Sequence, residues 1–133
     1  MNKYILAGIM VFSFISILNG EENINFLQNQ KYVCITKTLR YGDMTEELSV
    51  EEGAKQALRF YIDNKRVLHT DSLKYNSFDY NKDKKCYENT YAAICLTTNA
   101  GKRYLLRIFL QDELRGISHM SECIETEQWT LYQ

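Results

Sequence analysis

Hydrophobic and polar residues alternate with a period of two over several stretches of the chain, a pattern typical of half-buried β-strands. The first stretch carries Val33, Ile35 and Leu39 and ends at Gly42-Asp43, a turn-forming pair. Further stretches of this kind lie at residues 73–80, 91–98, 103–111 and 117–131. The pattern therefore predicts a curled antiparallel sheet of four to five strands.

Residues 49–65, SVEEGAKQALRFYIDNK, follow the period of an α-helix instead. Ser49 and Glu52 have the spacing of a capping box, in which each side chain satisfies a backbone amide at the start of a helix. One face of the predicted helix is apolar and comprises Val50, Ala54, Ala57, Leu58, Tyr61 and Ile62. We therefore expect one long helix that packs on the sheet, and an α+β fold.

The stretches at 91–98 and 103–111 are expected to form a hairpin. Asn99-Ala100-Gly101 suits a type I turn in which Gly101 is left-handed at a bulge. This turn places Ile94 opposite Leu106. The same apolar face then includes Ala92, Leu96, Tyr104 and Ile108, while Cys95 points to the other face, opposite Leu105.

The first twenty residues, MNKYILAGIMVFSFISILNG, have the composition of a secretory signal peptide. Lys3 precedes an apolar run, and Gly20 offers a small residue at the cleavage point. The alternative is a membrane anchor, but the run is shorter than the ~20 residues that a spanning helix needs. We expect a signal peptide at 1–20, a single secreted domain at 21–133, and no membrane span after cleavage.

The cysteines and the charge narrow the function classes. The four cysteines all lie in the predicted mature part, and an even count in an exported chain predicts two disulfides; they are Cys34, Cys86, Cys95 and Cys123. Zinc sites usually need cysteine pairs two to four residues apart, which this chain lacks, so we expect no metal or other cofactor. With 16 basic and 17 acidic residues, the chain has no basic excess for nucleic acid.

The segment QALRFYIDN, residues 56–64, resembles the helix of cystatins and cathelicidin prodomains. Those domains have a strand, one long helix and then an antiparallel meander, so the resemblance implies a cystatin-like fold with two disulfides. The segments with which cystatins inhibit papain-like proteases are not found: there is no Gln-x-Val-x-Gly, and Trp129 follows Gln128 instead of a proline. The resemblance thus implies the fold and puts papain-type inhibition in doubt.

Two disulfide pairings remain open. The cystatin-like order of strands implies Cys34 with Cys86, which leaves Cys95 for Cys123. The other pairing joins Cys86 to Cys95 and Cys34 to Cys123. We favour the second, because Cys95 is predicted to face away from the core, where a short local loop can reach it.

Two groups of side chains are candidates for function. Aromatic residues are abundant, and Tyr75, Tyr80, Tyr87 and Trp129 are the candidate binding surface, since tyrosine and tryptophan offer large contact areas. Ordinary packing in a sheet is the alternative explanation of these aromatic residues. His69 and His119 are the candidate acid and base of a hydrolase such as a nuclease, provided that one cleft brings them together.

These observations favour a secreted monomer that is not an enzyme and binds an extracellular protein. A secreted effector, a salivary or venom-type toxin and a divergent protease inhibitor all fit this description. The alternatives are a carrier of a small ligand, which needs an apolar cavity, and the histidine-dependent hydrolase.

Overall fold

The computed structural model describes residues 25–72, 74–111 and 114–129, so the predicted signal peptide lies outside the described residues. Residues 26–97 and 103–129 form one compact unit, and residues 98–102 are the tip of a β-hairpin with its turn at 100–101. The described elements, in chain order, are β1 (Tyr32–Tyr41), β2 (Met44–Glu47), α1 (Val50–Lys55), β3 (Leu58–Ile62), β4 (Val67–Thr70), β5 (Ser77–Asn81), β6 (Cys86–Glu88), β7 (Ala92–Asn99), β8 (Lys102–Phe109) and β9 (Ile117–Glu125).

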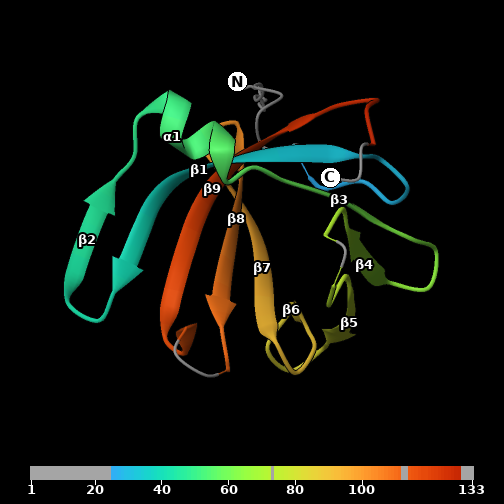
Figure 1. The fold of residues 1–133 in the computed structure, drawn as a ribbon. Helices are drawn as coiled ribbons and strands as arrows, with labels where there is room; N and C mark the ends of the chain where they lie inside the picture. Colours follow the sequence, from blue (N-terminus) through green and yellow to red (C-terminus); the bar gives the residue numbers. More distant parts are fainter. Residues whose placement is uncertain (1–24, 73, 112–113, 130–133) are drawn as a thin grey trace, which may run out of the picture. The chain divides into compact units, whose positions relative to one another are not determined.

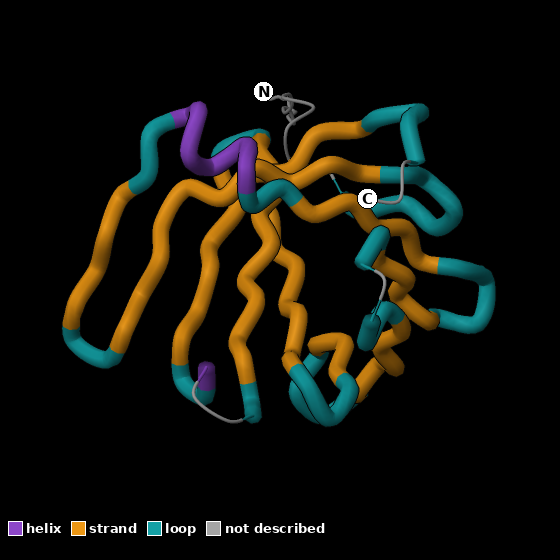
Figure 2. Tube along the Cα trace, viewed as in Figure 1, coloured by secondary structure: helices purple, strands orange, loops and turns teal. Residues whose placement is uncertain are grey.

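The strands form a closed antiparallel barrel (Figures 1 and 2). Strands β3 to β9 pair in chain order, and β1 pairs with both β3 and β9, so eight strands close on themselves. The longest of these pairings is the β1–β9 seam, from Tyr32 opposite Glu125 to Tyr41 opposite Ile117. Closure satisfies the backbone groups that would otherwise lie at the two edges of an open sheet.

The predicted α+β fold is wrong, because the long helix at 49–65 does not form. The capping box of Ser49 and Glu52 is present and starts α1, but α1 ends at Lys55. The following residues form β3, in which Leu58, Phe60 and Ile62 alternate into the core. The hydrophobic pattern of this segment fits a helix as well as a strand. The strand buries Phe60, which is not part of the apolar face of the predicted helix. The segment that resembled cystatins is therefore largely a strand.

The connection between β1 and β3 leaves the barrel wall and returns to it. Strand β2 pairs with residues 38–41 at the far end of β1, so β3 pairs only with residues 32–34 at its start. Helix α1 then crosses back against β1. Gly53 is buried there, and a Cβ atom at this position would lie 2.0 Å from the backbone oxygen of Thr36. Thr36 also donates its hydroxyl to the backbone oxygen of Gln56, which fixes the end of the helix to β1.

Aromatic side chains fill one end of the barrel. Tyr32 and Phe60 stack with ring centroids 5.3 Å apart, and both are fully buried. The ring of Phe26 packs against both of them. The guanidinium of Arg103 lies 5.3 Å from the centre of the Tyr32 ring and pairs with Glu125 at 3.3 Å. This end of the interior is therefore closed by close-packed side chains.

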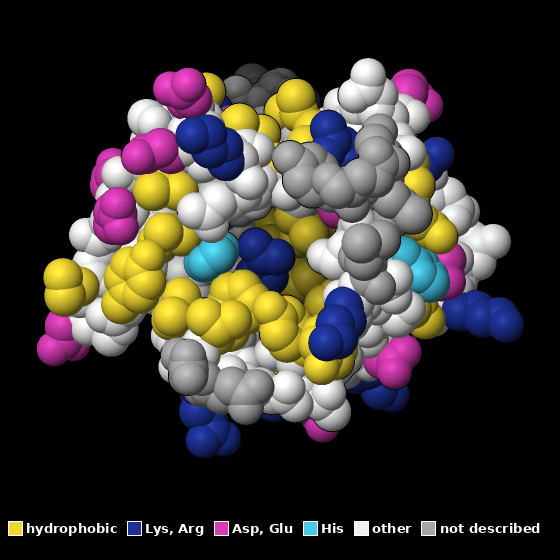
Figure 3. Space-filling model, viewed as in Figure 1, with side chains coloured by type: hydrophobic (Ala, Val, Ile, Leu, Met, Phe, Trp, Pro, Cys, Tyr) yellow, Lys and Arg dark blue, Asp and Glu magenta, His cyan; other side chains and the backbone are white. Residues whose placement is uncertain are grey.

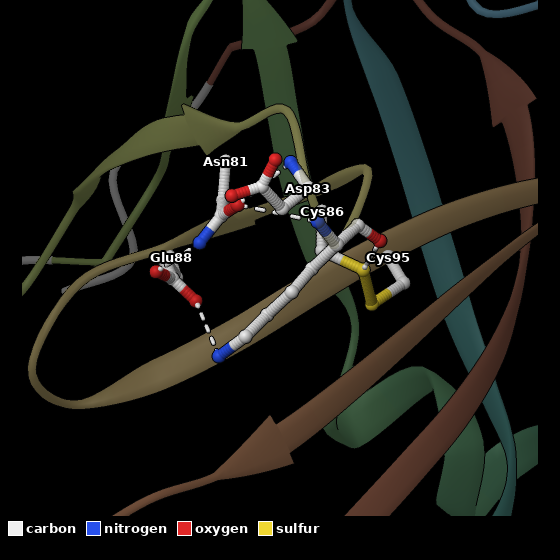
Figure 4. The surroundings of a disulfide bond; sticks show 6 residues. Asn81, Asp83, Cys86, Glu88 and Cys95 are labelled. Atoms are coloured by element: carbon white, nitrogen blue, oxygen red, sulfur yellow. Dashed lines mark hydrogen bonds and ion pairs between the residues drawn. A yellow bond between two sulfur atoms is a disulfide. The ribbon is translucent and has the colours of Figure 1, made fainter.

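Both disulfides join residues that face each other across neighbouring strands. Cys34 and Cys123 are direct partners across the β1–β9 seam, and both are buried. Cys86 and Cys95 join β6 to β7, near the point where Asn81 of β5 donates to Glu88 of β6 at 2.9 Å (Figure 4). The favoured pairing is confirmed, and the pairing implied by the cystatin-like order is wrong.

The register predicted for the β7–β8 hairpin is wrong by one residue. Ala100 and Gly101 both have positive φ, 52° and 79°, as in a two-residue type I′ turn. The amide of Leu110 donates to the backbone oxygen of Tyr91 at 2.9 Å. Leu105 is fully buried, whereas Leu106 is only half-buried. A shift of one residue turns the whole of β8 over, so Leu105 and Phe109 face the interior in place of Leu106 and Ile108.

Candidate functional site

The end of the barrel interior opposite the aromatic cluster is hollow. A cavity of about 280 Å³ is lined by residues 54–59, which comprise the end of α1 and the start of β3, together with Asp71, Ser72 and Arg107. Figure 3 shows the molecule hollowed near its centre, with hydrophobic side chains inside and basic and histidine side chains beside the hollow. The cavity is the candidate functional site.

Arg107 reaches this cavity across the barrel. It belongs to β8, which does not neighbour β3 or β4 in the sheet, so it can line the same cavity only from the opposite wall. Its neighbours on the same face of β8 are Leu105 and Phe109, both buried. The guanidinium carbon lies 5.1 Å from the centre of the Phe109 ring, which packs behind it.

The polar contacts of Arg107 leave part of its guanidinium unsatisfied. Its Nη2 atom donates to Nδ1 of His119 at 3.2 Å. Its Nε atom is buried and has no hydrogen-bond partner among the described residues. Burial lowers the pKa of Arg107, and the nearby Tyr91 and Asp71 raise it. Arg107 is thus a half-buried cation to which no described carboxylate is hydrogen-bonded, an arrangement that is costly for a folded protein.

His119 is neutral in this arrangement. Because a guanidinium only donates, Nδ1 of His119 must accept, and the ring proton is then on Nε2. Burial of the ring and the charge of Arg107 together lower the pKa of His119 to about 4. His119 therefore orients Arg107 and supplies no negative charge to balance it.

The same strand carries a second interior arginine, and this one has a carboxylate partner. Arg103 lies four residues before Arg107 on the same face of β8 and is paired with Glu125. Among the described residues, no comparable ion pair with a carboxylate is found for Arg107. The strand thus holds one arginine that is part of the structure and one that faces the cavity.

The other charged groups of the cavity leave it positive. Asp71 is buried, accepts from the amide of Arg59 at 3.1 Å, and lies 3.7 Å from the Arg59 guanidinium. Arg59 and Asp71 thereby neutralise each other, and Lys55 and Arg107 remain. Nε of Arg59 and Oγ1 of Thr70 are buried and also lack hydrogen-bond partners among the described residues. The cavity is therefore cationic, in a chain whose net charge is −1.

An aromatic row leads from the chain surface to Arg107. Tyr75 stacks on Tyr91 with ring centroids 4.7 Å apart, and Tyr91 packs edge-on against Phe109 with centroids 5.5 Å apart. The ring of Phe109 packs in turn against His119, with centroids 5.1 Å apart. Tyr75 is the exposed end of the row, with an exposed fraction of 45%. Of the four residues predicted as a binding surface, Tyr75 is thus connected to the candidate site.

The other three predicted binding residues lie elsewhere. The rings of Tyr80 and Tyr87 pack together with their centroids 5.0 Å apart. Tyr87 belongs to the core, where burial raises its pKa. Arg66 lies over the ring of Tyr80 at 4.2 Å. Trp129 is half-buried and packs edge-on against Tyr61. These contacts place the three side chains at positions separate from the Tyr75 row.

The two histidines are not brought together. His69 alternates with the buried Leu68 and Thr70 of β4, so it lies on the outer face, where its Nε2 bonds to Asp63 at 2.8 Å. This bond is the main reason why the pKa of Asp63 is lowered. His119 lies on the inner face of β9 beside Arg107. The acid–base pair that the hydrolase hypothesis requires is therefore not assembled in this structure.

A second hollow lies on the outer face of the barrel. This outer groove has a volume of about 560 Å³ and lies over β1, β2, β8 and β9. It is lined by Thr38, Arg40, Thr45, Leu106, Ile108, Gly116, Ser118 and Met120. Its apolar residues on β8, Leu106 and Ile108, are the ones that the sequence had suggested for the core, so both faces of this strand carry large apolar side chains.

No family model, curated protein or solved structure matches this chain. Among the described residues, no helix combines the length and apolar character needed to cross a membrane.

Proposed function

We propose that the protein is a secreted, non-enzymatic carrier that binds a small molecule in the open end of its barrel. The observation that carries this proposal is the cavity of about 280 Å³ inside a closed eight-stranded sheet. Barrels of eight strands have interiors that either fill with side chains or hold one small ligand. Here the aromatic cluster around Tyr32 fills one end, and the cavity at Arg107 occupies the other.

Secretion is supported by the signal-peptide pattern at residues 1–20 and is compatible with two disulfides. The carrier role is supported by the mixed lining of the cavity. Ala57 and Leu58 offer apolar contact, and a few polar groups converge there to fix an orientation, as in typical ligand sites.

The proposal is tested by titrating the oxidised protein with neutral and charged fluorescent apolar probes. Ala57→Trp places a large side chain in the lining of the cavity and should abolish binding. Ala93→Trp, on the outer face of β7, is the matched control and should bind like the wild type. Absence of saturable binding to any probe, or equal binding by both variants, contradicts the proposal.

A second candidate function is binding to an extracellular protein through the outer groove. The observation that favours it is the apolar character of the groove, together with Met44 and Tyr41 on the neighbouring hairpin, which are 71% and 41% exposed. Exposed apolar surface of this kind marks many interaction sites. Met120→Lys and Met44→Lys should then reduce capture of a target from extracellular fluid, and capture that is unchanged by both contradicts this candidate.

A further inference from the structure

The chemistry of the ligand follows from Arg107, the arginine of the cavity lining for which no carboxylate partner is found among the described residues. Arg107 donates to His119, packs on Phe109 and keeps a buried Nε without a partner among the described residues. Arg103, on the same face of the same strand, has a carboxylate partner in Glu125. Because a half-buried charge without an ion-pair partner is costly, this difference between the two arginines favours a bound group as the partner of Arg107.

The remaining side chains of the cavity indicate the sign of that group. Asp71 is already bound to Arg59, and His119 accepts from Arg107 only because it is neutral. Lys55 adds a second positive charge to the lining. A neutral or cationic head group would leave Arg107 uncompensated, whereas an anion would pair with it in a desolvated position.

The shape of the guanidinium narrows the chemistry further. Its planar array of donors matches the oxygen atoms of a carboxylate or a phosphate, which it binds in a bidentate manner. Phe109 packs behind it and His119 holds Nη2, so the group is oriented before a ligand arrives. Ala57 and Leu58 line the same cavity with apolar surface.

We infer that the cavity binds a small amphipathic anion, with its carboxylate or phosphate on Arg107 and its apolar body against Ala57 and Leu58. This inference rests on the proposed carrier function and adds the chemical class of the ligand. Arg107 is the binding residue, and His119 is a positioning residue that fixes the direction of the guanidinium.

A matched pair of probes separates the inference from the function on which it rests. 1-Anilinonaphthalene-8-sulfonate and N-phenyl-1-naphthylamine share the same aromatic body and differ in one sulfonate group. We expect the anionic probe to bind at least tenfold more tightly to the wild-type protein. Decanoate and decyl phosphate should displace it more effectively than decanol, and the better of the two anions identifies the natural head group.

Substitutions assign the effect to Arg107. Arg107→Gln should weaken binding of the anionic probe at least tenfold, as expected for loss of a charge-assisted hydrogen bond, and should change binding of the neutral probe less than twofold. Arg115→Gln, an exposed position with the same change of charge, is the control and should bind like the wild type. In the wild type, the NMR signal of the Arg107 Nε–H group should shift on addition of decanoate, a readout that requires no variant.

The outcomes are distinct. If both probes bind equally and Arg107→Gln changes neither, the anion inference is overturned and the carrier function stands. If neither probe binds, the carrier function fails and the inference fails with it. A preference for the anionic probe that is lost in Arg107→Gln, with the neutral probe unaffected, supports both.

Discussion

The two disulfides should contribute very unequally to stability. Cys34 and Cys123 are 89 residues apart in sequence, whereas Cys86 and Cys95 are nine apart. A crosslink that closes a longer loop removes more conformational entropy from the unfolded chain. The chain-entropy relation gives about 4.6 kcal/mol for the first disulfide and about 2.7 kcal/mol for the second. Removing the first should therefore cost about 2 kcal/mol more.

Burial acts in the same direction. Cys34 and Cys123 lie in the core, so Cys34→Ala/Cys123→Ala also leaves a space among buried side chains. Cys86 and Cys95 are half-buried, so Cys86→Ala/Cys95→Ala is the matched control with a smaller packing loss. Both double variants keep an even number of cysteines and one intact disulfide, which avoids unpaired thiols.

The assay is equilibrium unfolding in urea without reductant, followed by circular dichroism and by the fluorescence of Trp129. We expect the larger fall in the free energy of unfolding for the Cys34/Cys123 variant. We also expect faster hydrogen exchange along the β1–β9 seam in this variant. An equal or larger loss for Cys86→Ala/Cys95→Ala would refute the reasoning from loop length.

Three further predictions follow from the cavity and the helix. Arg107→Gln should raise the melting temperature in the absence of ligand, because it removes a half-buried charge that has no ion-pair partner among the described residues. A lower melting temperature, with that of Arg115→Gln unchanged, would show that the structure already satisfies Arg107. His119, whose pKa is lowered from the ordinary histidine value of 6.5 to about 4, should titrate near 4 in an NMR titration, and its pKa should rise in Arg107→Gln. Since the unfolded histidine takes up its proton near 6.5, stability should fall as the pH drops from about 6.5 to 4, and titration of His119 near 6.5 contradicts the assignment. Gly53→Ala should destabilise the protein by about 2 kcal/mol in urea unfolding, because the added methyl group clashes with Thr36. The higher helix propensity of alanine, about 1 kcal/mol, opposes this loss. A gain in stability would mean that the backbone moves enough to relieve the clash.

The sequence predicts local features correctly where a short motif can satisfy its interactions in only one backbone geometry. The capping box of Ser49 and Glu52 starts a helix because its two hydrogen bonds need that spacing. The pairing of Cys86 with Cys95 follows from a short loop between two strands. The predicted length of the helix was wrong because residues 58–62 fit the hydrophobic period of a helix as well as that of a strand. Only the pairing of β3 with β1 and β4 decides between the two.

The candidate site was missed for a related reason. Both faces of β8 carry large apolar side chains, so the pattern alone does not tell which face is inside. The predicted bulged turn placed Leu106 inward and Arg107 outward, and the two-residue turn at Ala100-Gly101 reverses both. A signal for the site was present nevertheless: with the correct turn, a basic residue falls between Leu105 and Phe109 on a buried face. Closure of the barrel depends on contacts between β1 and β9, which local patterns do not encode.

The disulfide across the β1–β9 seam has a topological consequence. From Cys34 to Cys123 the polypeptide is a covalent ring, and the tails before and after it are branches. A protease that cuts one exposed connection within this ring, such as residues 82–85, opens the ring without releasing a fragment. A nicked molecule would therefore keep its full mass until it is reduced, and the barrel would tolerate new termini at such a connection. For the secreted protein proposed above, a single cut by an extracellular protease would leave the two parts of the cavity wall attached to each other.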